Sequence, residues 1–145
     1  MAEPDGPELA PPLPAPTPTS RPFWDGLAEG RVCIQQCPAC EAWIFYPRSR
    51  CPRCLAGGLG WREVSGAATL YSWTLCRRPP SPHFAAWTPY LLAVVELAEG
   101  VRMTTILEDA DPDGLRAGLA LVPRFVDAGG IVQLRYAPAP AEGAP

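Results

Sequence analysis

The chain has 145 residues, a formal net charge of −3 and a pI near 5.1, so its length allows one ordinary domain with a small additional unit. The acidic balance argues against a surface that neutralises nucleic-acid phosphates, and all twelve basic residues are Arg, so no Lys is present for Schiff-base chemistry. No apolar run approaches the roughly 20 residues of a membrane-spanning helix, so we expect no membrane partner.

The first 19 residues contain seven prolines and few large apolar side chains. Such a composition cannot bury enough surface to offset the entropy lost on ordering, so we expect a disordered tail over residues 1–19. Residues 1–5 lack the basic and apolar regions of a signal peptide. We therefore expect a cytoplasmic protein with reduced cysteines.

A short helix is predicted over residues 20–30. Ser20 suits its N-cap, Pro22 its first turn and Gly30 the position after its last turn. A helix this short is not stable alone, so its apolar side chains must pack on the rest of the chain or on a partner. We assign these side chains to a candidate partner interface: Phe23, Trp24 and Leu27.

Two Cys-x-x-Cys pairs, Cys37/Cys40 and Cys51/Cys54, are separated by ten residues within the segment 31–64. Two residues between cysteines allow one tight turn to direct both sulfurs at a single ion, and zinc prefers a tetrahedral shell of such soft ligands. Because protein atoms fill all four positions, the predicted Zn²⁺ is structural and holds a ribbon that has little core of its own.

Other uses of these cysteines fit less well. Two disulfides need an oxidising compartment, and a redox pair needs a thioredoxin-like βαβ context. Cys33 is separated from Cys37 by three residues, which suits a metal-binding turn poorly. Four thiolates also bind iron in a rubredoxin-like site, so the choice between zinc and iron stays open.

An all-β pattern follows over residues 65–137, and residues 138–145 are expected to fray. Five strands are predicted, with a longer interruption between the third and the fourth, as in a Greek-key barrel of the OB type. The predicted fold class is therefore mainly β, with a short N-terminal helix, a rubredoxin-like zinc ribbon and a five-stranded OB-fold barrel. The predicted strands are residues 67–76, 90–97, 101–107, 119–126 and 131–136.

No catalytic centre is predicted from the residues. The segment 109–114 matches the opening of an EF-hand calcium loop, but Ala120 stands where a bidentate Glu should close the shell. His83 is the single histidine, and no nucleophile can be assigned to it. Cys76 lies on a predicted strand and is interpreted as a small core residue. We therefore expect no enzymatic activity from the chain on its own.

Several arginines accompany the ribbon and the first barrel strand. Guanidinium groups bind the phosphates of CoA or of nucleic acid, but they can equally form a solvated face or contact a protein partner. These interpretations stay open. The candidate contacts to CoA phosphates are Arg48, Arg50, Arg77 and Arg78.

Short motifs follow one another in a distinctive order along most of the chain. They are Phe23-Trp24-Asp25-Gly26-Leu27, Glu29-Gly30, Gln36-Cys37-Pro38-Ala39-Cys40, Tyr46-Pro47-Arg48, Cys51-Pro52-Arg53-Cys54, residues 61–66, Tyr71-Ser72-Trp73-Thr74, Val95-Glu96-Leu97 and Glu99-Gly100-Val101. Together they resemble the bacterial and archaeal family of small acyl-CoA-associated proteins with a zinc ribbon and an OB-fold, catalogued as domain of unknown function 35. The family's usual Gly after the second cysteine is Glu41 here, a departure that does not threaten the metal site.

The resemblance implies a non-catalytic accessory subunit of a thiolase-like enzyme that acts on CoA thioesters, namely a thiolase, an aldolase or an acyltransferase. Such a subunit would stabilise its partner and help to shape the acyl-CoA site, within a heterotetramer or a larger assembly. The four cysteines carry over as ligands of structural Zn²⁺, whereas catalytic residues would lie in the partner. The alternatives are a MaoC-type enoyl-CoA hydratase as partner and, further from the family, single-stranded nucleic acid.

Overall fold

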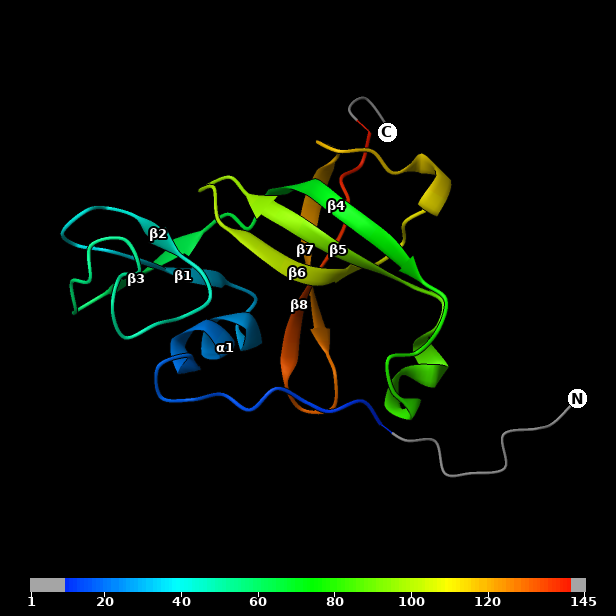
Figure 1. The fold of residues 1–145 in the computed structure, drawn as a ribbon, viewed down its shortest axis with the longest axis horizontal. Coiled ribbons are helices and arrows are strands. Elements are labelled where there is room, and N and C mark those ends of the chain that lie inside the picture. Colours follow the sequence, from blue (N-terminus) through cyan, green and yellow to red (C-terminus); the bar gives the residue numbers. More distant parts are fainter. Residues whose placement is uncertain (1–9, 142–145) are drawn as a thin grey trace, which may run out of the picture.

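The computed structural model describes residues 10–141 (Figure 1). As predicted, it is mainly β, with a short helix, a ribbon sheet and a closed five-stranded barrel. No helix in this range combines the length and hydrophobicity that crossing a membrane requires. The elements are α1 (Arg21–Ala28), β1 (Val32–Gln36), β2 (Trp43–Ile44), β3 (Gly60–Val64), β4 (Ala68–Cys76), η1 (Pro82–Trp87), β5 (Tyr90–Leu97), β6 (Arg102–Leu107), η2 (Pro112–Gly114), β7 (Ala120–Asp127) and β8 (Val132–Pro138).

Helix α1 starts and stops close to the predicted positions. Ser20 occupies the N-cap position, but its side chain does not cap the helix; its Oγ accepts a hydrogen bond from the Thr17 N–H at 2.9 Å instead. Gly30 follows the helix with a φ of +73°, a left-handed conformation that suits Gly. The signals for the helix ends were therefore informative, although Ser20 serves the preceding turn.

The three side chains assigned to a partner interface fall into two groups. Phe23 and Leu27 are only 3% and 1% exposed and belong to the main core of this chain. They are not available to a partner in this fold, because α1 packs against β1 and β8. Trp24 is half-buried, and its indole Nε1 donates to the Tyr46 hydroxyl at 3.3 Å. Trp24 therefore remains the one candidate contact of the three.

Residues 10–19 belong to the segment expected to be disordered, but the structure places them along the body of the chain. They run from α1 past the β7–β8 hairpin towards η1 (Figure 1). Leu13 lies beside Gly129, and His83 Nδ1 donates to the Ala10 carbonyl at 2.8 Å. These contacts are long-range, so proline content alone could not indicate them. The first nine residues and the last four, for which we expected disorder and fraying, lie outside the described range.

The ribbon is an antiparallel sheet with the strand order β2-β1-β3. Strand β2 has only two residues, because the Phe45 and Tyr46 that follow pack towards α1, with ring centres 5.5 and 6.4 Å from that of Phe23. The ribbon has only a small buried cluster of its own, formed by Cys37, Ile44 and Cys51.

The barrel has the strand order β4-β5-β6-β8-β7 and closes where β7 pairs with β4. Counted within the barrel, this order is first, second, third, fifth, fourth, as a five-stranded Greek-key barrel of the OB type requires. Strands β6 and β8 pair in parallel, with Leu107 opposite Tyr136. The interruption between the third and fourth strands holds η2. The predicted OB-fold is confirmed.

Ribbon and barrel share one hydrophobic core, to which α1, β1 and the barrel strands all contribute. At the joint between β3 and β4, the hydroxyl of the fully buried Tyr136 donates to the Gly66 carbonyl at 2.8 Å. A helix of eight residues is stable here because its apolar face completes this shared core.

Candidate metal centre

The two Cys-x-x-Cys pairs meet in the ribbon, where the four sulfurs all lie within 4.8 Å of one another. The Sγ atoms of Cys37 and Cys54 are 3.5 Å apart, and those of Cys40 and Cys51 are 3.6 Å apart. Tetrahedral zinc with Zn–S bonds of about 2.3 Å places its sulfur ligands about 3.8 Å from one another. The arrangement therefore suits a single zinc ion.

Two matching turns carry the sulfurs. In each turn, the residue after the second cysteine donates its N–H to the carbonyl of the first cysteine, at 3.0 and 2.9 Å. The N–H groups of Cys40 and Arg53 also lie 3.5 and 3.4 Å from the Sγ atoms of Cys37 and Cys51. Donors aimed at sulfur stabilise the thiolate, which is the form that binds a metal.

The thiol pKa values reflect these turns and the closeness of the sulfurs. The backbone N–H of Cys40 lowers the pKa of Cys37 to about 6, and that of Cys54 lowers the pKa of Cys51. For Cys54 itself, the backbone N–H of Ala56 acts to lower the pKa, but the neighbouring thiols, Cys37 first, raise it to about 11. A fully ionised set of four thiolates therefore needs a cation among them.

Zinc fits this donor set, because four soft ligands converge with tetrahedral spacing. Protein atoms occupy every position of the shell, so neither water nor substrate could coordinate a metal bound here. Such a metal contributes to folding, because the ribbon has little core without it. Cys33 stays outside the cluster; it is buried against α1, with Sγ 3.1 Å from the place that a Cβ on Gly26 would take.

The four candidate phosphate-binding arginines are divided between two ends of the molecule. Arg48 and Arg50 belong to the ribbon, where Arg50 Nη1 donates to the Leu55 carbonyl at 3.1 Å. Arg77 and Arg78 directly follow β4, whose C-terminal end lies far from the ribbon in Figure 1. The structure does not bring the four together, so they cannot form one phosphate site.

The other sequence features that resembled chemistry have structural explanations. His83 lies in η1 and donates to a backbone carbonyl. In the EF-hand-like segment, the Asp111 carboxylate accepts from the Asp113 N–H at 3.0 Å and thereby begins η2. Cys76 is half-buried at the end of β4.

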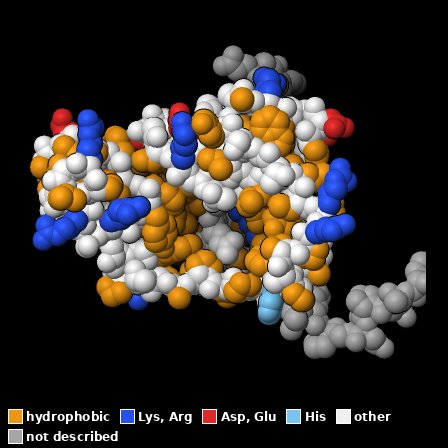
Figure 2. Space-filling view, in the orientation of Figure 1, with side chains coloured by type: hydrophobic (Ala, Val, Ile, Leu, Met, Phe, Trp, Pro, Cys, Tyr) orange, Lys and Arg blue, Asp and Glu red, His pale blue; other side chains and the backbone are white. Residues whose placement is uncertain are grey.

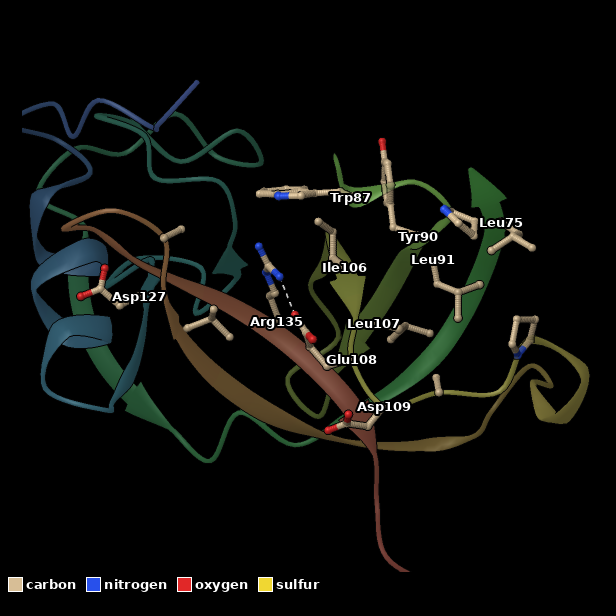
Figure 3. A pocket seen from close by; sticks show the side chains of 15 residues that line it. Leu75, Trp87, Tyr90, Leu91, Ile106, Leu107, Glu108, Asp109, Asp127 and Arg135 are labelled. Carbon is tan, nitrogen blue, oxygen red and sulfur yellow. Dashed lines mark hydrogen bonds and ion pairs between the residues drawn. The ribbon is translucent and has the colours of Figure 1, made fainter. Parts of the chain in front are cut away.

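A cavity of about 590 Å³ opens at one end of the barrel (Figure 3). Arg135 reaches into it from β8, forms an ion pair with Glu108 and lies beneath Trp87, whose ring centre is 4.9 Å from its Cζ. Sequence reasoning missed Arg135. In the sequence, Arg135 is a single charged residue between two apolar residues of a predicted strand. This pattern is typical of a side chain that faces outward to solvent, so it did not indicate a pocket. We call this cavity the barrel-mouth pocket; its walls include Leu75, Trp87, Tyr90, Leu91, Leu107, Glu108, Asp109, Asp127, Ala128 and Arg135.

A second cavity of about 480 Å³ lies between α1, the ribbon segment after β2 that contains Phe45 and Tyr46, and the outer face of the barrel. Trp24 and Tyr46 form one of its walls and Leu92 belongs to another. Ile106 and Arg135 line both cavities, so the two adjoin. Figure 2 shows this face of the molecule hollowed and edged with hydrophobic side chains.

Comparison with known proteins relates both halves of the chain to one family. Residues 24–60 match the rubredoxin-like zinc ribbon domain of ChsH2, and residues 61–126 match the C-terminal OB-fold domain of ChsH2. The solved structure of an Ltp2-ChsH2(DUF35) aldolase superposes on the chain with a TM-score of 0.77 and 29% identity, covering 87% of this chain and 98% of that one.

Two relatives illustrate the range of similar proteins. The "Probable enoyl-CoA hydratase alpha subunit" of Thermomonospora curvata is 36% identical over 109 residues, which cover 73% of this chain and 33% of the relative. A "DUF35 domain-containing scaffold protein" of Methanothermobacter thermautotrophicus is 34% identical over 90 residues, which cover 61% of this chain and 64% of the relative. The chain thus spans a third of the first relative's length and less than two thirds of the second's.

Proposed function

Because the chain belongs to the ChsH2 family of DUF35 proteins with a zinc ribbon and an OB-fold, we propose that it is a non-catalytic accessory subunit of an enzyme complex acting on CoA thioesters. One observation carries the proposal. Ribbon and barrel both resemble ChsH2 in the same order, and the chain covers nearly the whole of the corresponding chain in the Ltp2-ChsH2(DUF35) aldolase. The closed cysteine shell supports it, since a metal there has no open position for a reaction.

In this role Zn²⁺ bound by Cys37, Cys40, Cys51 and Cys54 supplies folding free energy. The metal keeps the ribbon rigid beside the barrel, so that both present one surface to the enzyme subunit. Catalytic groups then belong to that subunit, which we expect to be a thiolase-like enzyme such as an aldolase, in a heterotetramer or a larger assembly.

A hydratase is the second candidate partner, because the Thermomonospora curvata relative is named as an enoyl-CoA hydratase alpha subunit. The two partners differ in reaction. An aldolase complex cleaves a carbon–carbon bond of a CoA thioester, whereas a hydratase complex adds water to an enoyl-CoA. Assaying the purified complex for both reactions distinguishes them.

The proposal is tested by co-expressing the full chain with candidate CoA-thioester enzymes from the same genome, beginning with any that is encoded next to it. We expect the two to co-purify, and native mass spectrometry gives the stoichiometry. The enzyme expressed alone should be less soluble or less active. Turnover of an acyl-CoA by the isolated, zinc-loaded chain would contradict the non-catalytic role, and an enzyme fully stable and active without this chain would contradict the accessory role.

A further inference from the structure

The barrel-mouth pocket lies where OB-folds bind their ligands. In that fold, ligands contact the face of the second and third strands together with the loops that join strands one to two and four to five. Here those strands are β5 and β6, and those loops contribute Trp87 on one side and Ala128 on the other. In Figure 3, Trp87 and Tyr90 lie on one side of the pocket and Arg135 and Glu108 point into it from below.

The floor of this pocket is apolar. Leu91 and Leu107 reach it from the barrel interior, and both are 6% exposed. Leu75 and Ile106 add half-buried apolar surface. A volume of about 590 Å³ exceeds what water alone requires and matches the size of ordinary binding pockets. The floor therefore suits an apolar group.

The charges at the pocket are mainly negative. Three carboxylates line it, from Glu108, Asp109 and Asp127, against the one guanidinium of Arg135 among the described lining residues. Glu108 neutralises Arg135, whose side chain is only 14% exposed beneath Trp87. Asp109 and Asp127 are exposed. Neither aspartate forms an ion pair within the described part of the chain. An incoming anion would therefore meet two exposed carboxylates and a shielded guanidinium, whereas a cation would be attracted.

This charge distribution decides between possible occupants. The phosphates of nucleic acid or of CoA are disfavoured at this position, although OB-folds commonly bind oligonucleotides there. The adjoining cavity, walled by Trp24 and Tyr46, extends the apolar surface past Ile106. An occupant of both cavities is elongated, apolar along its length and basic at the barrel mouth. An extended polypeptide segment with an apolar residue next to Arg or Lys has these properties.

We propose that the barrel-mouth pocket docks such a basic and apolar segment of the partner enzyme subunit. The apolar side chain enters the floor between β5 and β6, and the neighbouring Arg or Lys pairs with Asp109 or with Asp127, which lie on opposite sides of the pocket (Figure 3). The inference rests on the proposed function, because it assigns the segment to the enzyme subunit of the complex.

The first test uses the full-length, zinc-loaded chain and two peptide probes. Acetyl-Leu-Arg-amide and acetyl-Leu-Glu-amide have the same apolar residue and opposite charges. By NMR, we expect the basic probe to shift the methyl signals of Ala110 and Ala128, which line the pocket, and the acidic probe to leave them unchanged. The basic probe should bind more weakly as salt is raised. Equal shifts with both probes, or no shift with either, would overturn the inference.

The second test uses the assembled complex and matched charge variants. The double variant Asp109→Asn/Asp127→Asn should weaken binding of the enzyme subunit about twofold to fivefold, because it removes the exposed ion pair whichever aspartate forms it. Both changes keep a side-chain oxygen, so the hydrogen bonds from the Gly129 and Gly130 N–H groups to Asp127 can persist. The control is Asp113→Asn. Asp113 lies on the same loop as Asp109 but does not line the pocket, so removing its carboxylate should have no effect.

Filling the pocket provides an independent arm. Ala128→Trp and Ala110→Trp occupy it from two walls, and each should weaken assembly by at least about tenfold while thermal unfolding stays cooperative. If the charge variants and both Trp variants assemble like the wild type, the pocket does not dock the partner, and the proposed function stands without it. If the basic probe binds but no enzyme subunit does, the proposed function fails, and with it the assignment of the occupant.

Discussion

Glu41 and Leu55 adopt left-handed φ values of 61° and 66°. Each follows the second cysteine of its pair, where the turn must bring its N–H back to the carbonyl of the first cysteine. Such a conformation costs a residue with a Cβ about 1–2 kcal/mol, a strain that Gly avoids. Glu41 tolerates it because the turn is held by a hydrogen bond from Gln36 Nε2 to its carbonyl at 3.2 Å and by the metal site itself.

The variant Glu41→Gly should therefore stabilise the zinc-loaded chain. The strain relieved is larger than the about 0.4–1 kcal/mol that Gly adds to the entropy of the unfolded chain, so we expect a net gain of about 0.5–1 kcal/mol in the free energy of unfolding. Urea denaturation measures it. The control Glu41→Ala keeps a Cβ and should give no gain; equal stabilisation by both variants would show that the carboxylate, rather than the backbone, is responsible.

At the scale of elements, the joint between ribbon and barrel depends on a close approach at Gly66. A Cβ at this position would lie 3.0 Å from Val32 Cγ2 and 3.1 Å from Pro123 Cγ, and the φ of +78° is left-handed as well. Val32 belongs to β1 and Pro123 to β7, so the joint holds ribbon and barrel strands together. Its geometry therefore decides how the two sheets share one core.

Replacing this glycine should be unusually costly. We expect Gly66→Ala to lower the free energy of unfolding by about 2–4 kcal/mol, since strain at positive φ adds to overpacking against two elements. Gly118→Ala is the matched control, because Gly118 has a φ of +84° and open space around the added methyl group. Denaturation of both variants separates the two causes. Equal losses would contradict a packing role for Gly66.

The Tyr136 hydroxyl ties β8 to the same joint. In Tyr136→Phe, the Gly66 carbonyl loses its donor, and we expect a loss of about 1–3 kcal/mol at pH 7. The control Tyr71→Phe changes an exposed tyrosine, 51% accessible to solvent, and should be nearly neutral. Urea denaturation of both variants measures the difference, and equal effects would contradict the importance of the hydrogen bond.

The same residue predicts a dependence on alkaline pH. Burial raises the pKa of Tyr136 well above its ordinary value of 10.0. Because the folded-state pKa is the higher one, this contribution to stability is fully present below pH 10 and is lost as the pH rises above it. The wild type should therefore lose stability between pH 10 and 11 more steeply than Tyr136→Phe. Parallel curves in this range would contradict the raised pKa.

Strand β4 contains an irregularity that also matters at this scale. Its pairing with β5 shifts between Leu70 and Ser72, which makes Tyr71 the extra residue of a bulge. Strict alternation predicts Leu70 and Ser72 on one face of the strand. In the structure Leu70 is buried, whereas Tyr71, Ser72 and Trp73 are all exposed. The bulge reverses the alternation after it, so that Trp73 and Leu75 lie opposite the buried Ala93 and Leu91, and Leu75 reaches the barrel-mouth pocket. Tyr71 itself lies at the surface, where the Arg102 guanidinium is 3.8 Å from its ring centre.

For the whole molecule, the shared core couples the metal site to the barrel. Phe23, Leu27 and Ile34 lie in the same cluster as Leu70 and Tyr136. Unfolding of the ribbon would therefore expose apolar surface that the barrel needs for its own stability. Loss of a metal bound by the four thiols should therefore destabilise the barrel as well as the ribbon.

The variant Cys40→Ser tests this coupling. We expect loss of bound metal, a fall in solubility, faster hydrogen exchange in β5 and β6, and loss of activity of the assembled complex. Metal analysis compares the ion content of the variant with that of the wild type, in which it also identifies the ion as zinc or iron. Hydrogen exchange measures the opening of β5 and β6. The control Cys76→Ser lies outside the cluster and should retain the metal. Loss of activity with metal and assembly intact would contradict a purely structural role.

Local patterns in the sequence were sufficient for the main elements and for the cluster of four cysteines. The two Cys-x-x-Cys turns are local structures whose chemistry depends on spacing, and the strands carry their own periodicity. The helix ends followed from Pro22 and Gly30 for the same reason. The order of a helix, a ribbon and five strands with one long interruption then led to the OB-fold, because few topologies accommodate that order.

By itself, then, the sequence determined the ribbon with its four clustered cysteines and the barrel that follows it. Only the tertiary structure decided that Phe23 and Leu27 face inward, that the candidate arginines lie apart, and that Arg135 is shielded within an acidic pocket. The physical reason is range. Spacing and periodicity act over a few residues, whereas burial and the local sum of charges arise between segments far apart in the chain, such as Arg135 with Glu108 and Trp87.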